Sequence, residues 1–285
     1  MRARILPVRT RFWRPGTNPT GEIVQSLPKI LRNGDFVVVS EKAICTAVGS
    51  IIDELRVNPC SLSRFLARIW MRIVWGYFLG PLTRLNYRNI QRIRDYPLEE
   101  GAAHKHVALR NAGFCQSLKH WSEGGIDTTN LPYRLSSLPL KEATQVASRI
   151  RGEIAASLGC STNVVIADSD KTFSFRNFHF STRKSKVPGI HNLGTMGFIL
   201  GRFFRCKPRS TPIAYAGREV GSDLLLNVAA LANKTRGCGA GRTVWDMAEA
   251  FDSSPTEVTW EMLDAVPHFP IVVVRLRGFS RPKPA

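Results

Sequence analysis

The sequence predicts a fold that mixes helices with a sheet, and three segments carry this prediction. Residues Phe36 to Ser40 form a continuous apolar run, which is typical of a strand buried on both faces. From Lys141 to Leu158, apolar residues recur at helical spacing and Gly159 follows as a stop. Residues Asn163 to Asp170 then begin as an apolar strand and end in carboxylates. A helix that returns the chain to a buried strand is typical of proteins whose helices pack on a sheet.

The other elements are expected in this order along the chain. They are an edge strand over Ile5 to Val8, a short helix from about Glu22 that Pro28 ends or kinks, a helix over Asp223 to Asn233, helices over Trp245 to Ala250 and Pro255 to Ala265, a strand over Pro270 to Arg275, and a basic tail from Arg277.

Composition restricts the class of protein. The chain has 285 residues, of which 44% are hydrophobic, so it is not a disordered chain. Its formal charge of +18 favours polyanionic partners, which include nucleic acid, an anionic membrane, and a phosphorylated and carboxylated substrate. The six cysteines are scattered without a C-x-x-C pair, which argues against a zinc knuckle or a disulfide framework. Met1 to Arg14 lacks the apolar core of a signal peptide, and we therefore expect a cytoplasmic protein with reduced thiols.

The segment Phe65 to Leu82 is apolar, aromatic and basic, with Arg68 and Arg72 on one helical face. Its longest uncharged run is too short to span a bilayer, so we expect no transmembrane segment. Two interpretations remain: a helix that lies in a membrane interface, and a helix that packs on protein. We favour packing on protein, with Gly76 and Gly80 interrupting or ending the helix.

His104 and His106 are two residues apart, so on a strand they would share one face. Such a pair could bind a metal, but no third ligand lies nearby in the sequence. We therefore expect a hydrogen-bonding role or contact with a substrate carboxylate, and ordinary surface histidines remain an equal alternative.

Two segments place carboxylates where a ligand could meet them. Gly124 to Pro132 reads as a tight turn in which Asp127 can bind a hard cation and Asn130 can bond a phosphate or ribose. The alternative is an ordinary capped loop, because Asp and Asn favour turns. Asp168 and Ser169 stand at the end of a buried strand, where open sheets present ligand-binding groups.

Cations accompany these carboxylates. Lys42 follows the strand that ends at Ser40, and it can meet a phosphate as a point charge. The glycine-rich loop from Lys234 to Thr243 offers backbone N–H groups together with Arg236 and Arg242. The loop lacks the Gly-Lys-Ser/Thr ending of a Walker A motif.

These motifs together carry a family resemblance. Gly-Gly-Ile-Asp127-Thr-Thr-Asn130-Leu-Pro, the downstream Val-Val-Ile-Ala-Asp168-Ser, and Gly34-Asp-Phe-Val-Val-Val-Ser-Glu-Lys42-Ala-Ile-Cys-Thr-Ala-Val-Gly49 are similar to segments of the F420-0:γ-glutamyl ligase family. Asn111-Ala-Gly-Phe-Cys115 also imitates the family's turn, but it puts Cys where the metal-binding Asp belongs. We choose Asp127, which makes residues 111–123 an insertion.

The resemblance implies an α+β fold with mixed sheets and two intertwined parts, usually a homodimer. Along the chain it implies residues 1–60 as the N-terminal part, 61–103 as a helical insertion, 104–276 as the remainder with the site, and 277–285 as a basic tail. It implies an enzyme that uses GTP and a divalent cation, manganese or magnesium, to join L-glutamate to the acidic substrate F420-0, and it allows for a monovalent cation. Asp127, Asp168 and Ser169 would hold the metal, the two aspartates being the catalytic pair, and Lys42, Asn130, Arg236 and Arg242 would contact nucleotide or substrate.

Several positions depart from the family's pattern. Thr10 to Trp13 replaces a nucleotide-contacting segment, and Thr46, Val48 and Thr235 replace polar family residues near the expected nucleotide. Two alternatives follow from these departures: a paralogue that joins an amino acid to another acidic acceptor, and a non-catalytic RNA-binding protein on the same fold. The acceptor, the number of glutamates added, and the choice of GTP over ATP stay open.

Overall fold

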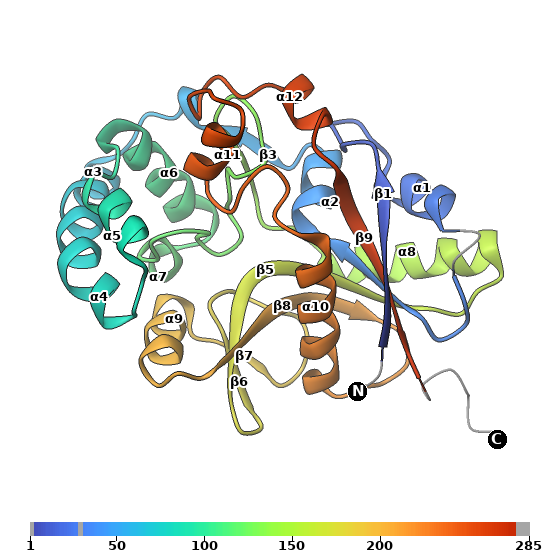
Figure 1. Cartoon of the computed structure of the whole chain (residues 1–285). Helices are drawn as coiled ribbons and strands as arrows, with labels where there is room; N and C mark the ends of the chain where they lie inside the picture. The colour runs from blue at the N-terminus through green and yellow to red at the C-terminus, as the bar shows by residue number, and fades with distance from the viewer. Residues whose placement is uncertain (1–2, 28–30, 278–285) are drawn as a thin grey trace.

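The computed structural model describes residues 3–27 and 31–277 and shows an α+β fold (Figure 1). Its main sheet has seven strands within this part of the chain, in the order β1-β9-β2-β5-β6-β7, with β8 paired to β5. The strands are β1 (Ala3–Thr10), β2 (Phe36–Ser40), β5 (Asn163–Phe175), β6 (Phe178–Ser181), β7 (Ile190–Asn192), β8 (Lys207–Ala216) and β9 (His268–Leu276). A second sheet pairs β3 (Ile51–Asp53) with β4 (Leu135–Ser137).

The helices divide between the sheet and a lobe beside it (Figure 1). On and around the sheet are α1 (Pro19–Ser26), α2 (Glu41–Ala47), α8 (Ala143–Leu158), α10 (Ser222–Arg236), α11 (Val244–Ala250) and α12 (Trp260–Asp264). The lobe contains α3 (Ser61–Phe65), the π-type helix η2 (Leu66–Leu79), α4 (Gly80–Leu82), α5 (Tyr87–Arg94), α6 (Leu98–Asn111) and α7 (Phe114–Ser117). The short 3₁₀ helix η1 (Glu54–Arg56) leads into the lobe, and α9 (Gly194–Phe203) lies below it in Figure 1.

Strand β2 lies at the centre of the sheet and is buried on both faces, as its apolar run predicts. Val37 and Val39 pack into the core beneath α1 and α8, whereas Phe36 and Val38 pack on the other side beneath α10. This alternation follows from the two-residue period of a strand. The strand therefore stabilises two cores at once, and its end is held in a fixed position.

Most predicted elements are confirmed, with small changes in length. The helix expected over 141–158 is α8, the expected edge strand is β1, and the expected last strand is β9. The strand expected from Asn163 is longer than predicted, and the helix expected over 255–265 is reduced to α12. Helix α1 ends at Ser26, while Pro28 and the basic tail after Arg277 lie outside the described residues.

The lobe packs on the rest of the chain through one face of η2. Met71 and Trp75 are fully buried, and the indole nitrogens of Trp70 and Trp75 both donate to the Leu118 carbonyl, at 2.7 and 2.8 Å. The opposite face of η2 exposes Ile73, Tyr77 and Phe78, and Phe65 at the end of α3 is exposed as well. Packing on protein is therefore confirmed for one face, and a cover for the other face, such as a dimer partner, stays a prediction. Among the described residues, no helix is long and apolar enough to cross a membrane.

Gly76 does not interrupt the helix, so the predicted break is wrong there. It is buried, and a Cβ at this position would lie 2.9 Å from the Cγ atom of Arg94. Arg94 crosses η2 at this point and donates from Nε to the Gly76 carbonyl at 3.0 Å. The glycine therefore permits a close approach instead of ending the helix.

His104 lies on α6 and not on a strand, so the expected shared face with His106 is wrong. Its ring contacts two buried carboxylates, with Nδ1 2.6 Å from Glu54 and Nε2 3.0 Å from Glu123. The buried Lys105 adds a 2.5 Å ion pair to Glu123. Burial alone would lower the pKa of His104, but the two carboxylates outweigh it and raise the pKa to about 10.

This raised pKa predicts a pH-dependent stability. Because the folded pKa of His104 lies above its unfolded value of about 6.5, the stabilisation is complete below about pH 6.5 and is lost as the pH rises through about 10. We expect the free energy of unfolding, measured by urea titration, to fall by on the order of a few kcal/mol across this window. A His104→Gln variant should be less stable at pH 6.5 and should lack this slope. Parallel profiles for the two proteins would contradict the prediction.

Candidate active site

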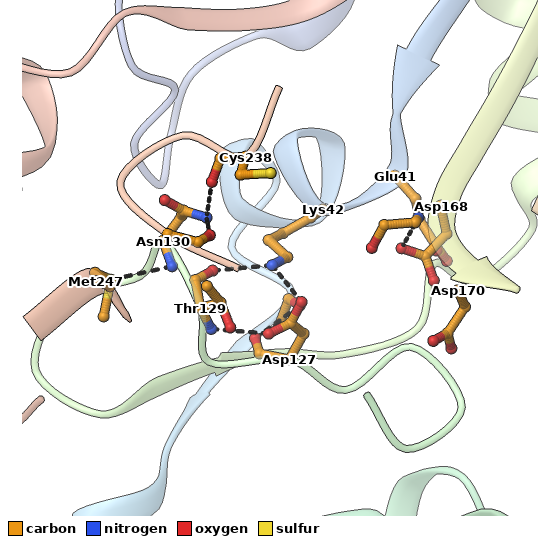
Figure 2. A network of polar contacts seen from close by, with 12 residues as sticks. Glu41, Lys42, Asp127, Thr129, Asn130, Asp168, Asp170, Cys238 and Met247 are labelled. Atoms are coloured by element: carbon orange, nitrogen blue, oxygen red, sulfur yellow. Dashed lines mark hydrogen bonds and ion pairs between the residues drawn. The ribbon is translucent and has the colours of Figure 1, made fainter. Parts of the chain in front are cut away.

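A cavity of about 610 Å³ opens where β2 and β5 end. The two strands are parallel neighbours, so their carboxyl ends meet at one edge of the sheet and bring Ser40 and Asp168 together. All seven residues proposed from the sequence line this cavity: Lys42, Asp127, Asn130, Asp168, Ser169, Arg236 and Arg242. Figure 2 shows the turn that carries Asp127 on one side and β5 with Asp168 on the other.

A buried arginine holds the base of the site. Arg183 is 3% exposed, and its guanidinium contacts both oxygens of Glu41 at 2.6 and 2.9 Å and one oxygen of Asp168 at 2.6 Å. Burial alone would raise the pKa of Asp168, but the attraction of Arg183 outweighs it and the pKa is lowered. Asp168 is therefore kept ionised at the cavity.

The sequence did not single out Arg183, which stands among many other basic residues between Lys171 and Pro212. Glu41 is the partner that it holds most tightly, and burial raises the pKa of this carboxyl while Arg183 partly opposes the rise. Glu41 also accepts the backbone N–H of Leu140 at 3.0 Å, so both of its oxygens are engaged. The sequence feature that points to a buried basic partner is Glu41, an acidic residue that directly follows the apolar run of β2.

The position of Arg183 leaves room only for a glycine at position 125 in the predicted turn. Its φ of +101° lies in the region that favours glycine, and a Cβ there would lie 2.4 Å from the guanidinium carbon of Arg183. The turn therefore rests directly on the ion pair below it. Gly125 brings the backbone close to Arg183 and Gly124 brings it close to Ala112 and Gln116, whereas the sequence suggested a close approach to a ligand.

Asp127 and Lys42 form an ion pair at the mouth of the turn (Figure 2). The Lys42 Nζ atom lies 2.5 Å from Asp127 Oδ2 and donates to the Thr129 carbonyl at 2.9 Å. The other oxygen of Asp127 accepts the Thr129 N–H at 2.8 Å. Both side chains are partly exposed to the cavity, so a ligand can reach them while they stay in place.

Asn130 connects the turn to the glycine-rich loop. Its side-chain oxygen accepts the Ala240 N–H at 2.7 Å, and its nitrogen donates to the carbonyls of Cys238 and Gly241 at 3.1 and 3.2 Å. A Cβ on Gly239 would lie 2.6 Å from the Asn130 oxygen. The amide is thus occupied by the loop, and Asn130 positions the cavity wall. Its predicted contact with a phosphate or ribose stays a prediction.

Cations outnumber acids in this cavity. Besides Lys42, the lining cations are Lys171, Lys234, Arg236 and Arg242, against Asp127 and Asp168. Burial lowers the pKa of Arg236 to about 10, and the nearby Asp168 offsets part of that effect. The Arg236 guanidinium donates to the carbonyls of Phe269 and Pro270, which leaves its positive charge uncompensated by a bonded carboxylate. A bound anion would compensate this charge.

The carboxylates fit a divalent cation that arrives with phosphates. Among the described residues, no group of three or more His, Cys, Asp or Glu side chains is placed to hold a metal. Asp127, Asp168 and the Ser169 hydroxyl nevertheless line one cavity, and each carboxylate oxygen retains a lone pair beyond its present bond. Magnesium is commonly bound by one or two carboxylates together with substrate phosphates, so this donor set suits it.

Comparison with known proteins gives two matches. The family described as F420-0:Gamma-glutamyl ligase matches residues 7–191. The uncharacterized protein MJ1361 of Methanocaldococcus jannaschii is 32% identical over 298 aligned positions, which cover 98% of this chain and 99% of that protein. The family match includes Lys42, Asp127 and Asp168 but ends before the glycine-rich loop. Roles for Arg236 and Arg242 therefore depend on the structure.

The contact between Gly125 and Arg183 predicts the effect of adding one methyl group. Gly125→Ala should lower the free energy of unfolding by about 2–4 kcal/mol, because the backbone is strained and Arg183 cannot move without leaving two carboxylates. Gly152→Ala is the matched control, since a Cβ on this helical glycine meets nothing within 4 Å. The control should be neutral or up to about 1 kcal/mol more stable in chemical denaturation. Equal effects at the two positions would refute this role of Gly125.

Proposed function

Because the chain belongs to the F420-0:γ-glutamyl ligase family, we propose that it is a GTP- and metal-dependent ligase that joins L-glutamate to an acceptor resembling F420-0. One observation carries the proposal beyond family membership. The cavity at the ends of β2 and β5 combines two carboxylates with five cations and a glycine-rich loop. This is the composition expected for a site that binds a nucleotide together with its metal.

The chemistry requires an activated acid. An amide does not form readily from a free carboxylate, so the acceptor's carboxyl group is first phosphorylated to an acyl phosphate. In phosphoryl transfer the protein takes little part in the covalent chemistry. It positions the reactants and stabilises their charge. When bound, a divalent cation screens the negative charge of the phosphates, and Asp127, Asp168 and Ser169 are the residues that would hold it.

The chain's own cations have separate tasks in this proposal. Arg242 is exposed at the cavity and meets the phosphates as they enter. Arg236 is fixed by the carbonyls at the start of β9 and supplies a charge deeper in the cavity. Lys42 holds the Asp127 carboxylate in a fixed orientation through their ion pair. These residues therefore orient the bound substrates before any reaction begins.

One observation favours a second candidate, a paralogue with a different acidic acceptor. Thr46, which departs from the family's pattern, lines the cavity, and its hydroxyl donates to the Lys42 carbonyl at 2.9 Å. The position therefore offers no charge to a ligand. A change of this kind inside the cavity alters what can be recognised there without altering the activation chemistry.

Measurements of nucleotide affinity test the roles of Arg236 and Arg242, which line the cavity. We expect Arg242→Ala and Arg236→Ala each to weaken GTP binding by about 1.5–3 kcal/mol, or roughly 10- to 150-fold, because each loses a charge-assisted hydrogen bond. Isothermal titration calorimetry with magnesium present measures this directly. Arg64→Ala is the control, since Arg64 is exposed on α3 and does not line this cavity.

Arg236 also holds β9 carbonyls, so the melting temperature of its variant must be recorded before its affinity is interpreted. If both arginine variants bind GTP as tightly as the parent, the loop is not part of a nucleotide site.

The reaction itself is tested with F420-0, L-glutamate, GTP and manganese, followed by mass spectrometry of the product. We expect an adduct of glutamate in the parent and at least a hundredfold lower initial rate in Asp168→Asn, which removes the charge that Arg183 and the cation share. If GTP is hydrolysed and phosphate released only with another acid, the paralogue is correct. Steep salt-dependent binding of RNA without any product would favour the non-catalytic alternative.

A further inference from the structure

The ends of two helices meet at the edge of the lobe, where α9 lies below it (Figure 1). Arg202 on α9 donates from Nε to the Thr83 carbonyl at 2.9 Å and from Nη2 to the Arg84 carbonyl at 2.7 Å. Arg84 donates in return to the Arg202 carbonyl at 3.3 Å. These bonds hold the carboxyl ends of α4 and α9 side by side, so the residues around them share one surface.

Large apolar side chains are exposed around this contact. Phe78 and Leu82, four residues apart at the end of the lobe's helix, are 65% and 44% exposed. Phe203 and Phe204 at the end of α9 are 46% and 65% exposed, with their ring centroids 5.1 Å apart. Single exposed apolar residues are ordinary, whereas a group of them on one surface indicates an interaction site.

The two segments that supply these residues contain no acid. Residues 55–94 and 171–218 include neither Asp nor Glu, although both segments are rich in basic residues. Arg84 and Arg205 are exposed beside the apolar side chains, and within the part of the chain that the structure describes neither of them pairs with a carboxylate. The surface is therefore positively charged and complements a negative one. We call these six residues the arginine–aromatic patch: Phe78, Leu82, Arg84, Phe203, Phe204 and Arg205.

The turn between β5 and β6 repeats this combination next to the patch. Lys207, at the start of β8 directly after α9, pairs with Ser174 in β5, so the residues that follow Ser174 lie near the end of α9. Phe175 and Phe178 in this hairpin are 62% and 49% exposed. The guanidinium carbon of Arg176 lies 5.8 Å from the centroid of the Phe175 ring. A second set of exposed rings and an arginine thus extends the same surface.

Charge disfavours a second copy of the chain as the occupant of this patch. In a two-fold dimer the same surface of both copies forms the interface. An acid-free surface would therefore meet another acid-free surface, and like charges brought together oppose association. A partner with negative charges of its own is required.

The kind of side chain favours a lipid surface over a nucleic acid. Proteins that bind single-stranded nucleic acid combine a positively charged groove with stacked aromatic rings. The patch residues line neither the cavity at the ends of β2 and β5 nor the adjoining cavity of about 210 Å³, which shares Asp127 and Thr129 with it. Leu82 also has no ring on which a base could stack. Apolar side chains among arginines suit the boundary between lipid headgroups and acyl chains.

We propose that the arginine–aromatic patch docks the protein on the surface of an anionic lipid bilayer. Phe78, Phe203 and Phe204 enter the boundary between headgroups and acyl chains, and Arg84 and Arg205 contact the lipid phosphates. This inference is independent of the proposed ligase function, because none of the patch residues lines the candidate active site.

Vesicle flotation of the full chain tests the proposal. We expect the protein to float with phosphatidylcholine vesicles that contain about 30% phosphatidylglycerol, at about 0.15 M salt, and to bind roughly tenfold less to vesicles of phosphatidylcholine alone. The absence of binding to both vesicles, or equal binding to both, would overturn the proposal. This comparison uses the parent protein, so it does not depend on the folding of a variant.

Variants with matched controls then locate the contact. Phe204→Ser and Arg205→Glu should each lower binding to the anionic vesicles roughly tenfold. Leu55→Ser on η1 removes an apolar side chain of similar exposure, and Arg9→Glu makes the same change of charge on β1, at the other edge of the sheet from β7. Both controls should bind within about twofold of the parent. Full binding by both patch variants, or equal losses in the controls, would refute this placement.

The other occupants give different results. Sedimentation that shows a dimer in the parent and a monomer in Phe204→Ser, without flotation of either, would assign the patch to a second copy and reject the membrane. Binding of single-stranded RNA that Arg205→Glu abolishes, again without flotation, would assign it to a nucleic acid. Measured melting temperatures show whether each variant is folded, as the exposure of Phe204 and Arg205 leads us to expect.

Discussion

The buried ion pair of Arg183 with Glu41 and Asp168 is the interaction on which the rest of the site depends. It joins the start of α2, the strand β5 and, through Gly125, the turn that carries Asp127. Removing charges from water is costly, and the attraction within such a pair offsets that cost best when its geometry is excellent and its remaining atoms are bonded. The guanidinium and a backbone N–H together occupy both oxygens of Glu41, whereas the buried Nε atom of Arg183 has no hydrogen-bond partner. The pair therefore fixes where three distant segments meet.

Much of the fold and most of the site could be predicted because they depend on local patterns. The periodicity of α8 and the apolar run of β2 each identify their own element. Lys42 and Asp168 were each singled out because they follow an apolar strand, and the structure places these two strands as parallel neighbours, so both residues line the cavity at their shared edge. The glycine-rich loop and the Asp127 turn lie in the same cavity, as their chemistry suggested.

The errors concern residues whose environment is decided by packing between distant segments. Gly76 has the sequence appearance of a helix breaker, but Arg94 from another helix requires its small size. The spacing of His104 and His106 fits a strand face, yet packing against Glu54 and Glu123 stabilises a helix there. Arg183 was not recognised because its two acidic partners are far away in the sequence. Such pairings cannot be deduced from spacing alone.

The three side-chain hydrogen bonds of Asn130 have a consequence for the cavity walls. They tie the glycine-rich loop, which lines the larger cavity, to the turn of Asp127 and Thr129, which lines both. The loop cannot move away from the turn without breaking these bonds, so a ligand that displaced the loop would also free the Asn130 amide. Any coupling between two ligands that arose through this contact would be reciprocal, by thermodynamic linkage.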